Sequence, residues 1–325
     1  MAQNITISSP EEYKERVEKY SLVTLKAGSK TQGTSSETSD DDVKGIHFNP
    51  MWMDFPELTE DKVSLKGDDI SSYGLDRFRE LLSKGNWDAV EMIHTGLAGG
   101  VYKDINKKEI IKFDKYDNIV KLNDDNPQAT KVRIEVDSLI DYEDIDKYDF
   151  LSPSRFVNCI KQPNTLLLSL FYNPEWVISK DTFNNTKDFI SYNSKSQKWD
   201  GKVANKDMDL KTGEVKNAKH VQHAFRIYNT CIQCIEESEK AGTVVPLRIN
   251  REGIDADWLK ELKYNNKYSA NELLEMLIEK KNKLEELMEN TTVIPEHISP
   301  KVVEFINRCC KRIKTRLYIR SLIKL

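Results

Sequence analysis

Two aspartates, Asp40 and Asp42, lie two positions apart in a segment that begins with the pair Gly28-Ser29. On a β-strand, alternate side chains project from one face, so we expect the two carboxylates to project together. Carboxylate oxygens are ligands that Mg²⁺ prefers. Gly28 has no side chain to keep a phosphate from backbone N–H groups, and Ser29 adds a hydroxyl beside it. The spacing predicts a site where a triphosphate and two magnesium ions meet, which is the arrangement that nucleotidyl transfer needs.

The elements around this segment must hold the two aspartates in place. Residues 22–25 are typical of a short strand, and residues 42–48 of a second one. Residues 27–39 between them are rich in Gly, Ser and Thr, which indicates a turn. Residues 9–12 (Ser-Pro-Glu-Glu) predict the start of a helix that runs to Tyr20. Each of these features alone more often has a purely structural role. Their combination in this order is what indicates a functional site.

Helical patterns dominate from about residue 200. One helix, with apolar residues at helical spacing from Val221, is expected to stop at Gly242. Ser269 with Glu272 forms a capping box that predicts a second helix, and Ser299-Pro300 predicts a third. The sequence therefore predicts an all-helical carboxyl-terminal domain.

The overall expectation is an α+β protein with two domains. An α+β core is expected over residues 1–200, and the helical domain over residues 201–325. Residues 96–131 show little periodicity, so we interpret them as an insertion rather than as core.

The ordered motifs around the aspartate pair resemble those of the DNA polymerase beta nucleotidyltransferase superfamily, and in particular its RNA-repair-pathway DNA-polymerase-beta-like family. The resemblance implies a polymerase-beta-like core, a small mixed sheet with helices, and transfer of a nucleoside monophosphate from a nucleoside triphosphate to an acceptor hydroxyl. The motifs that carry it are Gly28-Ser29, Gly33, Ser39-Asp40, Asp42, Gly45, residues 163–171 (PNTLLLSLF), residues 188–191 (DFIS), residues 219–226 (KHVQHAFR) and residues 262–269 (LKYNNKYS).

The resemblance also implies a third carboxylate on a neighbouring strand, which shares the metal and helps to deprotonate the acceptor. A weak internal repeat leaves two segments open for it. Asp144 and Asp146 precede the better matched downstream motif, whereas Asp69 follows the metal pair at a shorter distance. We favour Asp146 as a metal ligand and catalytic residue, then Asp144, with Asp69 as the competitor.

Lys219, His223 and Arg226 lie four and three positions apart, so they share one face of a predicted helix. Three potential cations in a stripe suit a triphosphate or an RNA phosphate, and with the resemblance we assign them, beside Gly28 and Ser29, to nucleotide binding. The alternative is a helix packed by its apolar residues, whose other face is merely solvated.

The charge distribution is uneven although the net charge is only -4. Residues 135–149 hold seven acids and one lysine, and residues 308–325 hold seven bases and no acid. The basic end could follow an RNA backbone, with Tyr318 for stacking, or could dock on the protein's own acidic segment. An RNA end is therefore one acceptor. Two other functions compete with transfer to RNA. One is an enzyme with the same chemistry that acts on a protein or small-molecule acceptor, and the other is a non-catalytic protein that binds nucleotide or RNA.

The composition argues against a membrane protein, because charged residues make up 31% of the chain and no apolar stretch approaches the roughly 18 residues of a span. The first residues lack the layout of a secretory signal, so we expect a cytoplasmic protein with reduced thiols. The pairs Cys231/Cys234 and Cys309/Cys310 fall in helical patterns. We interpret them as buried apolar residues rather than as zinc ligands.

Overall fold

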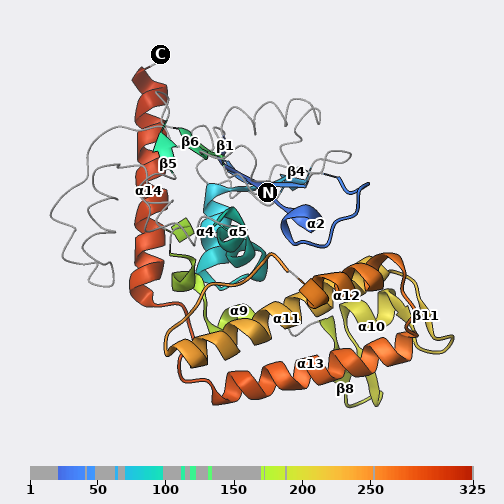
Figure 1. Cartoon of the computed structure of the whole chain (residues 1–325). Coiled ribbons are helices and arrows are strands. Elements are labelled where there is room, and N and C mark those ends of the chain that lie inside the picture. Colours follow the sequence, from blue (N-terminus) through green and yellow to red (C-terminus); the bar gives the residue numbers. More distant parts are fainter. Residues whose placement is uncertain are drawn as a thin grey trace, which may run out of the picture.

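The computed structural model shows an α+β protein that is mostly helical (Figure 1). The structure describes residues 21–40, 42–47, 63–64, 70–97, 111–113, 118–121, 131–133, 170–171, 173–186, 189–251 and 253–323. The expected helix over residues 9–20 lies outside these residues.

A mixed sheet forms the amino-terminal part, with strand order β3-β4-β2-β1-β7-β6-β5. β1 pairs with β2 and β7 in antiparallel fashion, whereas β2 and β4 are parallel. The strands are β1 (Ser21–Lys26), β2 (Val43–His47), β3 (Val63–Ser64), β4 (Ile70–Gly74), β5 (Ile111–Phe113), β6 (Asn118–Lys121) and β7 (Lys131–Arg133).

The two strands expected around the glycine-serine turn are present, with one difference in their limits. The first prediction, residues 22–25, lies within β1. The second strand begins at Val43, so Asp40 and Asp42 precede β2 rather than lie on it. The backbone N–H of Ala27 donates to the carbonyl of Asp42 at 2.9 Å, and beyond this bond the chain turns away from the ladder.

The segment expected as an insertion, residues 96–131, contributes to the main sheet. It contains β5 and β6 and the first residue of β7, which continue the sheet beyond β1. The strands are only three or four residues long, and short strands leave little periodicity for a sequence pattern to reveal.

Two helices pack on the sheet directly after β4. α4 (Leu75–Ser83) contacts β2 and β4, and α5 (Trp87–Leu97) contacts β1. The turn between them uses Gly85 with a φ of 62°, a conformation that favours glycine. Their buried faces, with Phe78 and Ile93 among the fully buried residues, form part of a core that continues into the helical part of the chain.

Short elements link this layer to the long helices. They are the 3₁₀ helix η2 (Pro174–Val177), α9 (Lys180–Asn184), the hairpin β8 (Ser191–Asn193) and β9 (Lys198–Asp200), α10 (Lys202–Lys206), and the hairpin β10 (Met208–Asp209) and β11 (Glu214–Val215). The second hairpin lies inside the domain that was expected to be all helical. Its turn is fixed because the Asp209 carboxylate accepts the N–H groups of Lys211 and Thr212, and Gly213 adopts a φ of 77°.

Four longer helices then follow, and the three that the sequence predicts are confirmed. They are α11 (Ala218–Ala241), α12 (Gly253–Tyr264), α13 (Ala270–Asn290) and α14 (Pro300–Ile323). Gly242 ends α11 in the left-handed conformation, and Ser269 caps α13 with both bonds of a capping box. α11 packs against α12 and α13, while α14 returns to α4 (Figure 1). Within the described residues, no helix has both the length and the apolar character that crossing a membrane requires.

We expect Ser269→Ala to lower the free energy of unfolding by about 1 kcal/mol, because it leaves the backbone N–H of Glu272 without its capping oxygen. Denaturant unfolding would measure the change. Ser194→Ala, at an exposed turn position, is the matched control and should leave the midpoint unchanged. An equal, negligible effect of both changes would show that the capping box contributes nothing measurable.

Candidate functional site

The loop of residues 27–42 joins β1 to β2 and carries the predicted aspartates; we call it the carboxylate loop. It opens with the short helix α2 (Gly28–Thr31), whose first residue has a φ of 69°. A Cβ built on Gly28 would overlap the carboxylate of Asp42. The structure therefore brings Gly28 and Asp42 into contact, and only glycine fits at position 28 without a shift of Asp42.

Hydrogen bonds within the carboxylate loop hold its remaining residues. The Thr31 hydroxyl donates to the Ala27 carbonyl at 3.2 Å, and the Thr34 N–H donates to the Ser29 carbonyl at 2.9 Å. Further along, the Ser39 hydroxyl accepts the Ser36 N–H at 2.9 Å. The loop is thus ordered by its own short polar side chains.

The chemistry of the loop's side chains suits a hard cation. Asp40 is exposed, Asp42 is partly buried, and Ser29 offers a third oxygen close to Gly28 along the chain. Oxygen ligands of this kind are those of Mg²⁺. In the part of the chain that the structure describes, no three acidic, histidine or cysteine side chains converge in a way that could hold a metal ion. In the described part of the carboxylate loop, Asp40 and Asp42 are thus the two predicted metal ligands that can be located.

The three candidates for the third carboxylate, Asp69, Asp144 and Asp146, lie outside the described residues. The sheet nevertheless identifies the strands that flank β2, which are β1 and β4. β4 begins at Ile70, the residue after Asp69, and Ile70 pairs with Val43, the residue after Asp42. Since β2 and β4 are parallel, the chain enters both strands from the same edge of the sheet.

The carboxylate loop also contacts the helical part of the chain. The Arg251 N–H donates to the Gln32 carbonyl at 3.0 Å. Gly33 has a φ of 75°, and a Cβ there would collide with the Arg251 carbonyl and the Asn250 side chain. Two glycines of the loop therefore lie where another part of the chain comes too close for a side chain. Gly28 contacts Asp42, and Gly33 contacts the segment before α12.

Tyr264, the last residue of α12, makes a further contact with this loop. Its hydroxyl lies 3.2 Å from the Ser39 hydroxyl and donates to the Thr34 carbonyl at 3.5 Å. Partial burial opposes ionisation, but hydrogen bonds from Lys263, Ser36 and Ser39 outweigh it and lower the pKa of Tyr264 to about 8. Its side chain is still 43% exposed.

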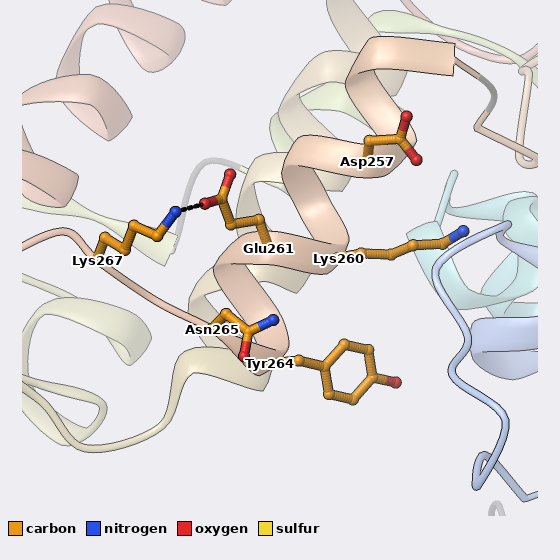
Figure 2. Close-up of a pocket in the computed structure, with 6 residues that line it drawn as sticks. All are labelled: Asp257, Lys260, Glu261, Tyr264, Asn265 and Lys267. Atoms are coloured by element: carbon orange, nitrogen blue, oxygen red, sulfur yellow. Dashed lines mark hydrogen bonds and ion pairs between the residues drawn. The ribbon is translucent and has the colours of Figure 1, made fainter.

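An open cavity of about 570 Å³ lies along the same helix (Figure 2). It is lined by Asp257, Lys260, Glu261, Tyr264, Asn265 and Lys267. Lys267 is paired with Glu261, whereas Lys260 and Tyr264 extend together away from that pair in Figure 2. The cavity therefore places a lysine and an exposed aromatic ring on the flank of α12 that meets the carboxylate loop.

The predicted phosphate stripe on α11 has a different environment from the one expected. Lys219 is exposed, His223 is partly buried, and Arg226 has no exposed side-chain surface. Nη1 of Arg226 lies 2.8 Å from Oε1 of Glu91 on α5, and Nη2 donates to Nδ1 of His223 at 3.2 Å. Arg226 is thus buried in an internal ion pair and does not face solvent, where a phosphate ligand would approach.

The alternative interpretation of this helix holds for its apolar packing face, but not for a solvated opposite face, because Arg226 is buried. The side chains concerned, Val221, Phe225 and Tyr228, are all fully buried. An α-helix places residues four apart on neighbouring positions, and the residues four before and four after Arg226, Gln222 and Thr230, are also buried, so Arg226 projects from a buried side of α11.

Lys44 extends the buried ion pair to the strand that follows the aspartates. Its Nζ lies 3.5 Å from Glu91 and 4.0 Å from Asp88. Burial alone would favour the neutral form of Glu91, but the charges of Arg226 and Lys44 hold the pKa of Glu91 at about 2. Burial and the Arg226 charge lower the pKa of His223 to about 4, so His223 is neutral near pH 7 and accepts from Arg226. We call Glu91, Arg226, His223 and Lys44 the buried charge cluster.

Sequence reasoning missed Glu91, Lys44 and Tyr264. Glu91 is a lone acid within the apolar run of residues 89–93. A charged side chain in such a run is buried only when it is paired, so this pattern was a signal for a buried ion pair. Tyr264 lies in the motif of residues 262–269, but no role was predicted for it. No comparable signal marked Lys44.

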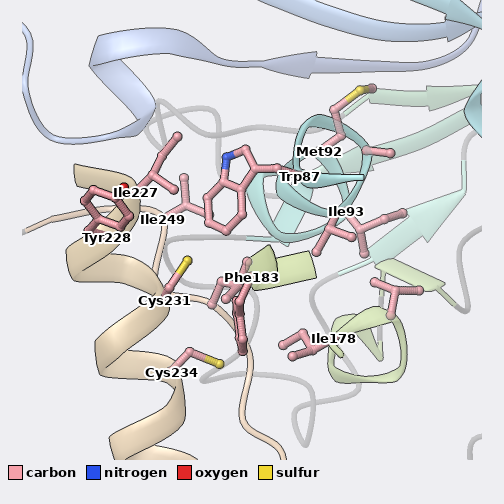
Figure 3. Close-up of a cluster of buried hydrophobic side chains, with 14 of the residues drawn as sticks. Trp87, Met92, Ile93, Ile178, Phe183, Ile227, Tyr228, Cys231, Cys234 and Ile249 are labelled. Atoms are coloured by element: carbon pink, nitrogen blue, oxygen red, sulfur yellow. The ribbon is translucent and has the colours of Figure 1, made fainter. Parts of the chain in front are cut away.

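The predicted zinc alternative for the cysteines can be assessed for four of them. Cys231, Cys234, Cys309 and Cys310 are buried and unbridged. Figure 3 shows Cys231 and Cys234 among apolar side chains such as Phe183. Burial raises the pKa of Cys231 well above its usual value and that of Cys234 to about 12, which keeps both as neutral thiols. Their interpretation as buried apolar residues is confirmed.

No protein-family model, curated protein or solved structure matches this chain, so its function is inferred from its own residues.

We expect Arg226→Ala to lower the free energy of unfolding by about 3–5 kcal/mol, because it leaves Glu91 buried without its main counter-charge. The matched control is Arg248→Ala, which removes a pair with Glu237 in which the arginine is 65% exposed. Such an exposed pair contributes less than about 1 kcal/mol. Chemical denaturation of both variants would measure the difference, and losses of equal size would contradict a structural role for the buried pair.

Proposed function

We propose that this protein is a nucleotidyltransferase with a polymerase-beta-like core, which moves a nucleoside monophosphate from a nucleoside triphosphate to an acceptor hydroxyl. The single observation that carries the proposal is the contact between Gly28 and the carboxylate of Asp42. It joins the two halves of the motif, because the space that Gly28 leaves by lacking a side chain is filled by the acid that can hold a metal.

The sheet supports this proposal independently of the loop. An antiparallel pair, β1 and β2, carries the carboxylate loop at its end, and a parallel strand, β4, flanks β2. The third carboxylate that the resemblance implies needs a neighbouring strand entered from the same edge, and β4 is such a strand.

Asp40 and Asp42 would hold the metal ions, with Ser29 as a further oxygen. Two Mg²⁺ ions, when bound, supply charge stabilisation for the attacking and the leaving oxygen. The backbone at Gly28 and Ser29 would bind the triphosphate, and the exposed Lys219 is the member of the predicted stripe that a phosphate can reach. Arg226 would act indirectly, since its pair with Glu91 fixes α11 against α5.

For the third carboxylate, the strand arrangement changes the order of preference. We place Asp69 first, because the residue after it pairs with the residue after Asp42. Asp146 and Asp144 become the alternatives. A base at this position must reach the acceptor hydroxyl directly or share a metal with it.

The acceptor remains open between an RNA end, a protein hydroxyl and a small molecule. The basic residues of the carboxyl-terminal helix favour RNA, since lysines and arginines along one segment can follow a phosphate backbone. A non-catalytic nucleotide-binding protein is the rival class. Pyrophosphate release in the presence of Mg²⁺ separates an enzyme from this rival, and labelled-nucleotide transfer to each acceptor separates the substrates.

We expect Asp40→Asn and Asp42→Asn each to remove most of the Mg²⁺-dependent nucleotidyl transfer, because an amide cannot supply the charge that holds a metal against the triphosphate. Release of pyrophosphate would be measured with the purified full chain. Glu289→Gln, at an exposed acid on α13, should release pyrophosphate at the parental rate. An Asp40 or Asp42 variant with an unchanged melting profile and near-parental transfer would show that the proposed metal pair is wrong.

The third carboxylate calls for a pair of variants. If Asp69 supplies it, Asp69→Asn should lower turnover strongly while triphosphate binding stays nearly intact, because Asp40 and Asp42 still hold the nucleotide-bound metal. Asp146→Asn should then change neither turnover nor triphosphate binding appreciably. Turnover and triphosphate affinity measured on both variants decide between them. The reverse result would assign the role to Asp146, and full activity in both would exclude the two positions.

A further inference from the structure

An accessible hydroxyl of the helical part lies beside the proposed metal site. Tyr264 places its oxygen 3.2 Å from the hydroxyl of Ser39, and Ser39 directly precedes Asp40. The Tyr264 side chain is 43% exposed, so a ligand in solution can approach it. An acceptor for nucleotidyl transfer must be a hydroxyl that reaches the metal-bound phosphate, and the contact with Ser39 brings the Tyr264 hydroxyl to the residue next to the proposed ligand Asp40.

We propose that Tyr264 is a self-modification site, to which the enzyme transfers a nucleoside monophosphate from its own bound triphosphate. This inference rests on the proposed function, because it uses the same carboxylates and the same triphosphate. It adds a protein hydroxyl of this chain to the acceptors considered above.

The step balances without any further reactant. The Tyr264 oxygen attacks the α-phosphorus of the triphosphate and forms a new P–O bond, while the bond between the α-phosphorus and the bridging oxygen to the β-phosphate breaks. Pyrophosphate leaves with that electron pair, and the phenolic proton passes to solvent. The product is a phosphodiester between the tyrosine and the nucleoside.

Nearby hydroxyls are less suited to the reaction than Tyr264. The Ser36 hydroxyl lies 3.2 Å from that of Thr38 and 3.3 Å from that of Ser39, and these groups together provide the hydroxyls nearest to Tyr264 in the carboxylate loop. A serine or threonine alcohol is a far weaker acid than a phenol. Hydrogen bonds from Lys263, Ser36 and Ser39 lower the pKa of Tyr264. They therefore make its reactive phenolate form even easier to reach.

The cavity beside Tyr264 provides room for the transferred group. Its volume of about 570 Å³ falls in the range of small-molecule sites. Lys260 lies one helical turn before Tyr264, on the same face of α12, and extends on the same side (Figure 2). Its ammonium group can balance the negative charge of the phosphodiester, and the nucleoside can lie along the cavity.

Incubation of the purified full chain with Mg²⁺ and radiolabelled ATP, followed by denaturation, tests the proposal. The expected result is label that stays with the denatured protein and maps to the tryptic peptide of residues 264–267. Because the acceptor belongs to the same chain, the labelled fraction at a given time should not depend on protein concentration. Because the labelled peptide is identified on the parental protein, this result does not depend on whether any variant folds.

Two tyrosine variants give the matched comparison. Tyr264→Phe should reduce the label to background, whereas Tyr192→Phe, at the more exposed tyrosine of the β8–β9 hairpin, should be labelled like the parent. Label that persists in Tyr264→Phe overturns the assignment. Pyrophosphate release with an added acceptor but no label on the chain overturns self-modification alone, and no pyrophosphate release with any acceptor overturns the proposed function as well.

Discussion

The ion pair between Arg226 and Glu91 joins two parts of the chain that fold into different layers. Arg226 belongs to α11 at the centre of the helical part, and Glu91 belongs to α5 on the sheet. Neither charge is hydrated, so each needs the other: a large penalty would follow if one partner were lost while the other stayed buried. Lys44 brings β2 into the same cluster. The strand that follows the aspartates is therefore held by the contact that also joins the two layers.

The carboxylate loop is held from two sides as a result. On one side, the β1–β2 ladder ends in the bond from Ala27 to Asp42. On the other, Arg251 and Tyr264 bind the loop from the helical part. A loop that carries ligands for a reaction must hold them within a fraction of an ångström, and support from rigid elements on both sides is one way to achieve this.

The sequence predicted features that depend on a few neighbouring residues. The strand at residues 22–25, the capping box at Ser269 and the stop at Gly242 were each specified by local pattern. The burial of Arg226 could not be predicted in this way, because it depends on Glu91, which is distant in sequence. The role of β5 to β7 was missed because strands so short carry no clear alternation.

The contacts of Gly33 and Ser39 have a consequence for the order in which the protein is made. The carboxylate loop is synthesised early, but its partners Arg251 and Tyr264 come much later along the chain. A ribosome produces about 5–20 residues per second, so the loop waits many seconds for these contacts. A nascent chain that has not yet reached α12 has the aspartates but lacks half of the support for their loop. These contacts of the carboxylate loop are therefore completed late in translation, and fragments that end before α12 lack them.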